Sequence, residues 1–221
     1  MRLLRPRRGR RSAAASAYKA AKPPPPATPW REARYAVVDL ETTALDPRRD
    51  EIVSFASIPI EDARVMVGGT RATIVRPARM PKAETIRIHG LRPADLADAP
   101  VLDEVLYLML ESLTGRVLVA HVAWVERGFL AAALKRTGLR LTEPVLDTSV
   151  LARQVLPPED LRDGQVLSLA DLAGTLGLPV HSPHVAAGDA LTTAQLFLAL
   201  ATHLDHKEPQ TIGSLARLSS G

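Results

Sequence analysis

The clearest hydrophobic pattern in the chain is a nearly continuous apolar run, residues 35–40, which stops at Glu41-Thr42-Thr43. Such a run is typical of a central strand that is covered on both faces. Residues 51–60 are rich in Ile, Val and Phe, and residues 65–75 form a third apolar stretch that Gly68-Gly69 interrupts. Turn residues separate the three stretches, so the pattern predicts three antiparallel strands in a meander.

Beyond residue 100, short apolar runs alternate with helical spacing. Helices are predicted over residues 101–113, 124–134, from 148 onward, 168–176 and 186–204. The short apolar runs at 116–121 and 145–147 predict two further strands. Strands first and alternating strands and helices afterwards indicate an α/β fold, with a mixed five-stranded sheet flanked by helices.

The first 34 residues differ from the rest in charge. They carry ten Lys and Arg against one acid, whereas residues 35–221 carry eighteen against twenty-three. Four consecutive prolines and the lack of a lasting apolar period leave too little apolar surface to offset the entropy of ordering. We therefore predict a disordered, basic, Pro/Ala-rich tail over residues 1–30, a domain over 31–206 and a C-terminal tail over 207–221. The Arg-rich start also resembles a transit peptide, but we favour a tail that contacts nucleic acid non-specifically.

The composition limits the possible chemistry. The chain has no cysteine, which excludes disulfides, thiolate metal sites and cysteine nucleophiles. Any metal must then be held by oxygen and imidazole ligands, which favours Mg²⁺ or Mn²⁺. The absence of cysteine fits a reducing cytoplasm, so we expect a cytoplasmic protein. No run of 18 apolar residues is present, and no membrane partner is expected.

Asp39 and Glu41 lie two positions apart in the first predicted strand, so their side chains project from the same face. They lie near its C-terminal end, where α/β sheets tend to bind ligands. Two carboxylates on one face repel each other unless a cation lies between them. The pair therefore indicates a divalent metal site, although two acids that merely end a strand and begin a turn give the same pattern.

His184 precedes the last predicted helix, and Asp189 lies in its first turn. The residues between them include Ala186, Ala187 and Gly188, which would leave room for a substrate or a metal. A histidine on such a loop can take a proton from a water molecule. Taken alone, the two residues also fit a loop histidine and an acid that is favoured by the helix dipole.

Glu126 opens a helix that directly follows the strand predicted at 116–121. In a solvated helix a Glu followed by Arg127 is ordinary, and this acid on its own would be interpreted as a surface residue. Its role as a candidate metal ligand depends on the other segments.

Taken in chain order, these segments resemble the DEDDh (DnaQ-like) 3'-to-5' exonuclease family, which includes the proofreading epsilon subunit of bacterial DNA polymerase III. The motifs are Asp-x-Glu-Thr from Asp39, His-x-Ala-x-x-acid-x-x-Phe-Leu from His121 and His-x-Ala-x-x-Asp from His184. The stretch Ile86-Arg87-Ile88-His89-Gly90-Leu91 and the segment Leu146-Asp147-Thr148 are also similar to stretches of that family. The resemblance covers roughly residues 35–204.

The resemblance implies an RNase H-like fold in which four acids hold two Mg²⁺ or Mn²⁺ ions, roughly 3.5 to 4 Å apart. By similarity, Asp39 bridges both ions, and Glu41 and Asp189 complete the ion that holds the attacking water. Glu126 then reaches the second ion directly or through water.

The same resemblance implies that His184 deprotonates the attacking water and that a nucleoside 5'-monophosphate leaves the strand end. Thr42 is expected to contact the terminal nucleotide, and His89 to line its pocket. The implied substrate is nucleic acid with a free 3' end, and a DNA polymerase subunit is a candidate partner.

The chain departs from the family pattern at four positions. The family usually has Asp at the position of Glu126, Asn at Val122, Phe at Val125 and Gly at Ala44. Glu in place of Asp matters most, because the extra methylene moves a carboxylate by more than a metal site tolerates unless the backbone or a water adjusts. We read an active variant that acts on DNA in proofreading or repair. The alternatives are an RNA or oligoribonucleotide exonuclease of the same family and a catalytically silent nucleic-acid-binding module.

Overall fold

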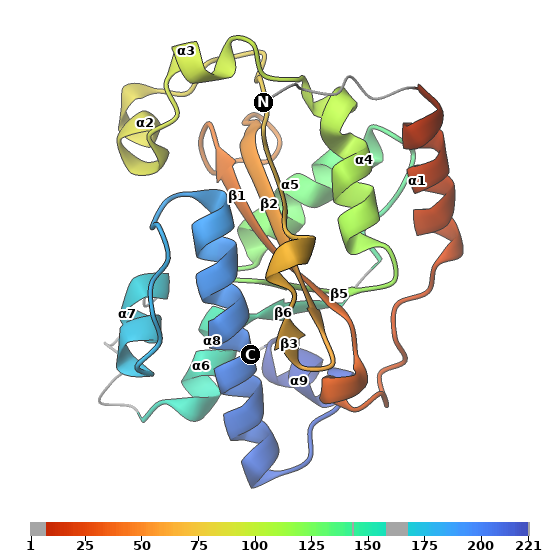
Figure 1. Ribbon diagram of the computed structural model, residues 1–221, viewed down its shortest axis with the longest axis vertical. Coiled ribbons are helices and arrows are strands. Elements are labelled where there is room, and N and C mark those ends of the chain that lie inside the picture. The colour runs from red at the N-terminus through yellow and green to blue at the C-terminus, as the bar shows by residue number, and fades with distance from the viewer. Residues whose placement is uncertain (1–7, 143, 158–167, 221) are drawn as a thin grey trace.

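A computed structural model describes residues 8–142, 144–157 and 168–220. Within these residues a single mixed sheet is covered by helices on both faces (Figure 1). The strands are β1 (Tyr35–Thr42), β2 (Ile52–Glu61), β3 (Arg64–Val65), β4 (Arg71–Ile74), β5 (Val117–Ala120) and β6 (Val145–Asp147). The α-helices are α1 (Arg8–Ala20), α2 (Ala83–His89), α3 (Pro93–Leu96), α4 (Leu102–Leu113), α5 (Trp124–Lys135), α6 (Thr148–Val155), α7 (Leu169–Thr175), α8 (Ala186–Lys207) and α9 (Ile212–Leu218).

The sheet has the order β3-β2-β1-β5-β6, and β4 also pairs with β2. β1 and β2 are antiparallel, whereas β5 and β6 extend the sheet in parallel. The mixed sheet was predicted with five strands, and the described residues form six. The difference arises in the predicted third strand, where the short 3-10 turn Val67–Gly69 divides the stretch into β3 and β4.

Alternation along β1 divides the core between the two faces of the sheet. Tyr35 and Val37 are buried against Phe197 of α8, while Ala36 and Val38 are buried against the α4 and α5 side. Because side chains alternate along a strand, the α8 face continues through Asp39 and Glu41 at the end of β1. The last residues of β1 therefore present carboxylates to the N-terminal end of α8.

The prediction of a disordered N-terminal tail is wrong for residues 8–20, which form α1 and pack along α4 (Figure 1). Its apolar side is small but effective, since Ala14 and Tyr18 are buried in the core on the α4 face. On its polar side, the Arg10 guanidinium pairs with Glu111 at 3.1 Å and lies over the ring of Tyr107. The two buried side chains and this ion pair hold the helix against α4, and composition alone does not reveal these contacts. Residues 1–7 lie outside the described residues.

The C-terminal tail is also part of the fold. Ile212 and Leu215 of α9 are buried in the core on the α8 face. The segment before α9 is tied to the chain before β1, because the Ile212 N–H donates to the Thr28 carbonyl and the Gly213 N–H to that of Pro26. The structure thus joins parts of both predicted tails to the sheet; residue 221 lies outside the described residues.

Among the described residues, no helix combines the length and the apolar character that crossing a bilayer requires.

The docking of α1 predicts a stability effect that a loose tail would not show. Tyr18 is 6% exposed, and its hydroxyl donates to the Arg140 carbonyl at 2.9 Å. Replacing Tyr18 by Ala should lower the free energy of unfolding by about 3 kcal/mol because it leaves a cavity, while Tyr18→Phe should cost only about 1 kcal/mol for the lost hydrogen bond. Urea denaturation measures both, and an unchanged stability of Tyr18→Ala would contradict the docked helix.

Candidate active site

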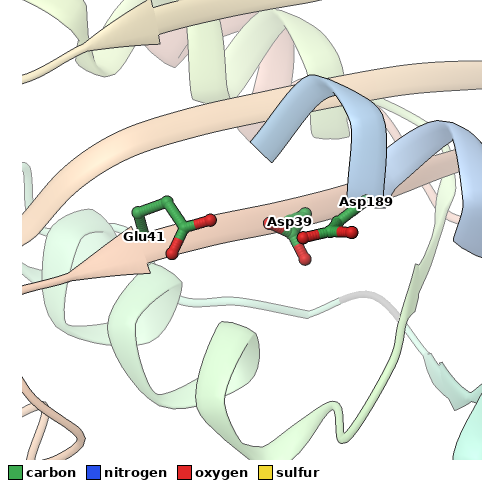
Figure 2. A group of neighbouring side chains, drawn as sticks. All are labelled: Asp39, Glu41 and Asp189. Carbon is green, nitrogen blue, oxygen red and sulfur yellow. The ribbon is translucent and has the colours of Figure 1, made fainter. Parts of the chain in front are cut away.

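Three carboxylates meet where the end of β1 faces the start of α8. One oxygen from each of Asp39, Glu41 and Asp189 lies within 4.8 Å of the others, and all three side chains are partly buried. Figure 2 shows Asp189 reaching down from the first turn of α8 toward Asp39, with Glu41 further along the same strand. The structure brings together three of the four acids that the sequence analysis singles out, and the group could hold a metal ion.

Small residues let α8 approach the sheet closely enough to bring the acids together. Ala186 and Ala190 of α8 are buried against Ala56 and Ile58 of β2. A larger side chain at either alanine would push the helix away from the strand and carry Asp189 with it. The spacing of the site is therefore set by the packing of α8 on the sheet as well as by the acids themselves.

Burial raises the pKa of all three carboxyl groups, and neighbouring acids add to this at Asp39 and Glu41. The pKa of Asp39 lies well above its ordinary value, first because of burial and then because of the charges of Glu126, Glu41 and Asp189. Burial and the neighbouring Asp189 raise the pKa of Glu41 to about 8. Burial also raises the pKa of Asp189, although the His184 N–H that it accepts partly opposes this. A group of acids that repel one another in this way is stabilised by a cation.

Glu126 is placed differently from the other three acids. It lies in the first turn of α5, is only 5% exposed, and does not belong to the three-acid group. Its charge nevertheless acts on Asp39, and burial raises its own pKa to about 8. Among the described residues its Oε2 is buried without a hydrogen-bond partner. A buried carboxylate oxygen that no donor satisfies fits a site completed by a cation.

The loop of residues 181–184 folds tightly onto α8 just before Asp189. A Cβ at Gly188 would lie 2.2 Å from the His181 carbonyl oxygen and 2.6 Å from that of Ser182. The space that we expected Gly188 to leave for a substrate or metal is therefore filled by the chain's own backbone. His184 follows with a φ of 60°, and its N–H donates to Asp189 Oδ2 at 2.8 Å, while its side chain is exposed.

Asp147 is a structural residue of the site whose role the sequence reasoning missed. It ends β6, and its carboxylate accepts the N–H groups of Val122 at 3.1 Å and Ala123 at 2.8 Å, just before α5. It also accepts from the backbone and the hydroxyl of Ser149 and so caps α6. The position of an acid at a strand end was visible in the sequence, but its partners were not.

The turn held by Asp147 has an unusual backbone. Val122 has a φ of 57°, a left-handed conformation that is costly for a β-branched residue and that Asn adopts more easily. The hydrogen bonds from the Val122 and Ala123 N–H groups to Asp147 hold the backbone in this strained conformation.

The two predicted substrate contacts lie outside the acid group. Thr42 is buried next to Glu41, where a bulge interrupts the pairing of β1 with β2. His89 ends α2 and is buried, and α2 is tied to the end of β1 because the Thr85 hydroxyl donates to the Thr43 carbonyl. The Nδ1 atom of His89 accepts the Leu91 N–H, so the proton of the neutral ring is on Nε2, which has no partner among the described residues. Burial lowers the pKa of His89 and favours this neutral form.

The raised pKa values predict how stability depends on pH when no metal is bound. When the pKa of a group is higher in the folded than in the unfolded protein, the group stabilises the fold at pH values below its unfolded-state pKa. This stabilisation is lost as the pH rises through the folded-state pKa. For Glu41 and Glu126 the window runs from the ordinary glutamate pKa of 4.5 to about 8. The melting temperature in EDTA should therefore fall between pH 5 and pH 8.5, and Mg²⁺ or Mn²⁺ should restore it at pH 8.5. If the melting temperature of the triple variant Asp39→Asn/Glu41→Gln/Asp189→Asn depended on pH as strongly as that of the wild type, this explanation would be contradicted.

Comparisons with known proteins agree with the site. The RNase T family model, described as an exonuclease, matches residues 36–197. The DNA polymerase III subunit epsilon-like protein of Rhodobacter capsulatus is 35% identical over 85% of this chain, and the match covers 26% of that protein, so the chain spans about a quarter of its length. The DNA polymerase III subunit epsilon of Aquifex aeolicus is 28% identical over 86% of this chain and 92% of its own.

The fold is also shared with a solved exonuclease. The structure of exonuclease X in complex with 5' overhanging duplex DNA aligns with 84% of this chain and 98% of that chain, at a TM-score of 0.63 and 25% identity. The expected RNase H-like fold is confirmed by this likeness and by the mixed sheet with flanking helices. Because the family model spans most of the chain and includes both β1 and the start of α8, the protein belongs to the RNase T exonuclease family.

Proposed function

We propose that the protein is a metal-dependent 3'-to-5' exonuclease of the DEDDh type, which hydrolyses the terminal phosphodiester of DNA and releases nucleoside 5'-monophosphates. The observation that carries the proposal is the convergence of Asp39, Glu41 and Asp189 on one face of β1, within reach of the charge of Glu126. Four acids around one point would repel a phosphodiester on their own, so the site requires positive charge before it can bind its substrate.

The four acids would hold two Mg²⁺ or Mn²⁺ ions. Oxygen ligands of this kind suit those ions, and the unpaired Oε2 of Glu126 is a further ligand atom near the three-acid group. When bound, the two ions supply charge that neutralises the phosphate during in-line attack. Glu126 lies outside the three-acid group, so it would hold one of the ions either directly or through a water.

His184 acts as the general base. It takes a proton from the attacking water, whose oxygen forms a bond to the terminal phosphorus. The bond between that phosphorus and the 3' oxygen of the preceding nucleotide breaks, and the terminal nucleotide leaves with the phosphate on its 5' carbon. The hydrogen bond from the His184 N–H to Asp189 fixes the loop beside the acids, and the exposed side chain is free to approach a bound strand end.

Thr42 and His89 would position the terminal nucleotide. The His89 Nε2–H is a buried donor without a partner among the described residues, so a hydrogen bond to the substrate would satisfy it. Thr42 follows Glu41 directly in the chain. Both roles follow from the family resemblance and are supported by the position of these residues next to the end of β1.

DNA is the proposed substrate because relatives include DNA polymerase III epsilon proteins and because exonuclease X was solved with duplex DNA. A DNA polymerase subunit in the cytoplasm is the proposed partner on the same grounds. RNA is distinguished from DNA by contacts to its 2'-hydroxyl, so the experiment below includes both polymers.

Digestion of 5'-labelled single-stranded DNA and RNA of matched sequence tests the proposal. With Mg²⁺ or Mn²⁺ the DNA should shorten stepwise from its 3' end, and EDTA or Asp39→Ala should abolish the ladder. Faster digestion of RNA would reassign the substrate to an oligoribonucleotide class. Binding without cleavage with either metal would indicate a silent nucleic-acid-binding module.

Two matched histidine variants in the same assay test the assignment of the base. His184→Ala should lower turnover at least about 100-fold and leave Mn²⁺ affinity close to that of the wild type. His203, an exposed histidine further along α8, provides the control, and His203→Ala should retain full activity. Full activity of His184→Ala would show that another group takes the proton.

A further inference from the structure

A groove lined by arginines lies between the β1–β2 loop, the segment after β4, the start of α4 and the C-terminal half of α5. We call it the arginine groove. Its volume is about 640 Å³, and its apolar lining includes Ile52, Val75 and Phe129. The arginines that line it are Arg48, Arg49, Arg76, Arg79 and Arg136, and the acids are Asp50, Glu51 and Asp103.

The arginines of this groove are only partly neutralised. Arg136 donates to Asp103 at 3.1 Å, and Arg49 lies 3.8 Å from Asp46. Across residues 8–142, 144–157 and 168–220, the other three form no ion pair. A guanidinium without a carboxylate partner keeps its full charge and its free donors for an anion.

Two of these three guanidiniums are positioned by neutral groups. Arg76 donates to the Ala97 carbonyl at 3.1 Å, and Arg79 donates to the Arg49 carbonyl at 2.7 Å. A backbone carbonyl orients the guanidinium group but does not cancel its charge, so the remaining N–H groups stay available to an anion. Because these side chains are already oriented, less conformational entropy is lost when an anion binds.

The walls of the groove are held to each other. The Ala78 N–H donates to the Glu51 carboxylate, which joins the segment after β4 to the β1–β2 loop. On the other side, Pro47 packs so closely on α5 that a Cβ at Gly128 would lie 2.9 Å from its Cγ. These contacts make the groove part of the packed fold.

The groove is linked to the acids through shared elements. The β1–β2 loop, which lines the groove, begins directly after Glu41 and Thr42, and the Thr43 N–H donates to the Glu51 carbonyl. Helix α5 carries Glu126 in its first turn and Arg136 at its C-terminal end. Ten residues of helix span about 15 Å, so the Arg136 end of the groove lies about four phosphate steps of a duplex strand from Glu126.

The charge of the remaining chain makes this groove distinctive. Residues 35–221 carry eighteen Lys and Arg against twenty-three acids, so the chain from β1 onward has a net negative charge. A polyanion approaching such a surface is attracted where uncompensated positive charge gathers. The groove lining carries five arginines against three acids, and three of these arginines form no ion pair among the described residues.

We propose that the arginine groove binds backbone phosphates of the nucleic acid about four steps away from the phosphodiester that is cut. This inference rests on the proposed exonuclease function and deepens it, because it makes a polynucleotide the substrate and excludes dinucleotides as the preferred one. Phosphate contacts of this kind carry no sequence information, so the groove raises affinity for long strands of any sequence.

The experiment compares Arg48→Gln/Arg79→Gln with a control of equal charge change, Arg34→Gln/Arg64→Gln. Arg34 and Arg64 are exposed at the opposite end of the sheet, where β1 begins and β3 pairs with the end of β2. Cleavage of a 12-nucleotide and a 3-nucleotide DNA is measured over a series of salt concentrations. The 12-mer is used alone and with a recessed complementary strand, which identifies the strand that the groove contacts.

In the groove variant, kcat/KM for the 12-mer should fall about tenfold, with a salt dependence shallower by about 1.4 in log–log slope for two single-strand phosphate contacts. The 3-mer and the control variant should be unaffected. Equal values for the groove and control variants on the 12-mer, or an equal fall on the 3-mer, would overturn the inference. If the wild type cleaves nothing, the proposed function has failed, and fluorescence anisotropy of the same DNAs with the same variants still tests the groove.

Discussion

The repulsion among carboxyl groups at the end of β1 is the constraint on which the rest of the site depends. Asp39, Glu41 and Asp189 converge within 4.8 Å, and Glu126 adds its charge to that of the others at Asp39. Without a cation these groups hold protons at unusually high pH, because burial and mutual repulsion both disfavour their charged forms. The protein thus retains an arrangement that is costly on its own and becomes favourable when positive charge enters it.

The surrounding fold holds this arrangement in place. Alternation along β1 puts two acids on the α8 face, small residues on α8 bring Asp189 close, and Gly188 admits the loop that carries His184. On the other side, Asp147 anchors the turn before α5 and thereby places Glu126. Each acid is therefore positioned by a different packing contact, which makes the geometry sensitive to changes away from the acids themselves.

Much of this could be predicted from the sequence. The two-residue spacing of Asp39 and Glu41 within the predicted strand placed them on one face, and helical spacing located α4, α5 and α8 within a few residues. The helical tail segment α1 was not predictable from its composition, because its stability depends on Tyr18 packing across a long sequence separation. The hydrogen bonds of Asp147, the backbone contact at Gly188 and the arginine groove likewise join segments that are far apart in the chain, and no local pattern reports them.

The proposed role of the three converging acids is to hold divalent cations. Diffraction from crystals soaked in Mn²⁺, collected at an X-ray energy where manganese scatters anomalously, locates the ion directly. The account predicts anomalous density in contact with carboxylate oxygens of Asp39, Glu41 and Asp189, and its absence from crystals of Asp39→Asn. Density elsewhere, or none at this group under conditions that support cleavage, would contradict it.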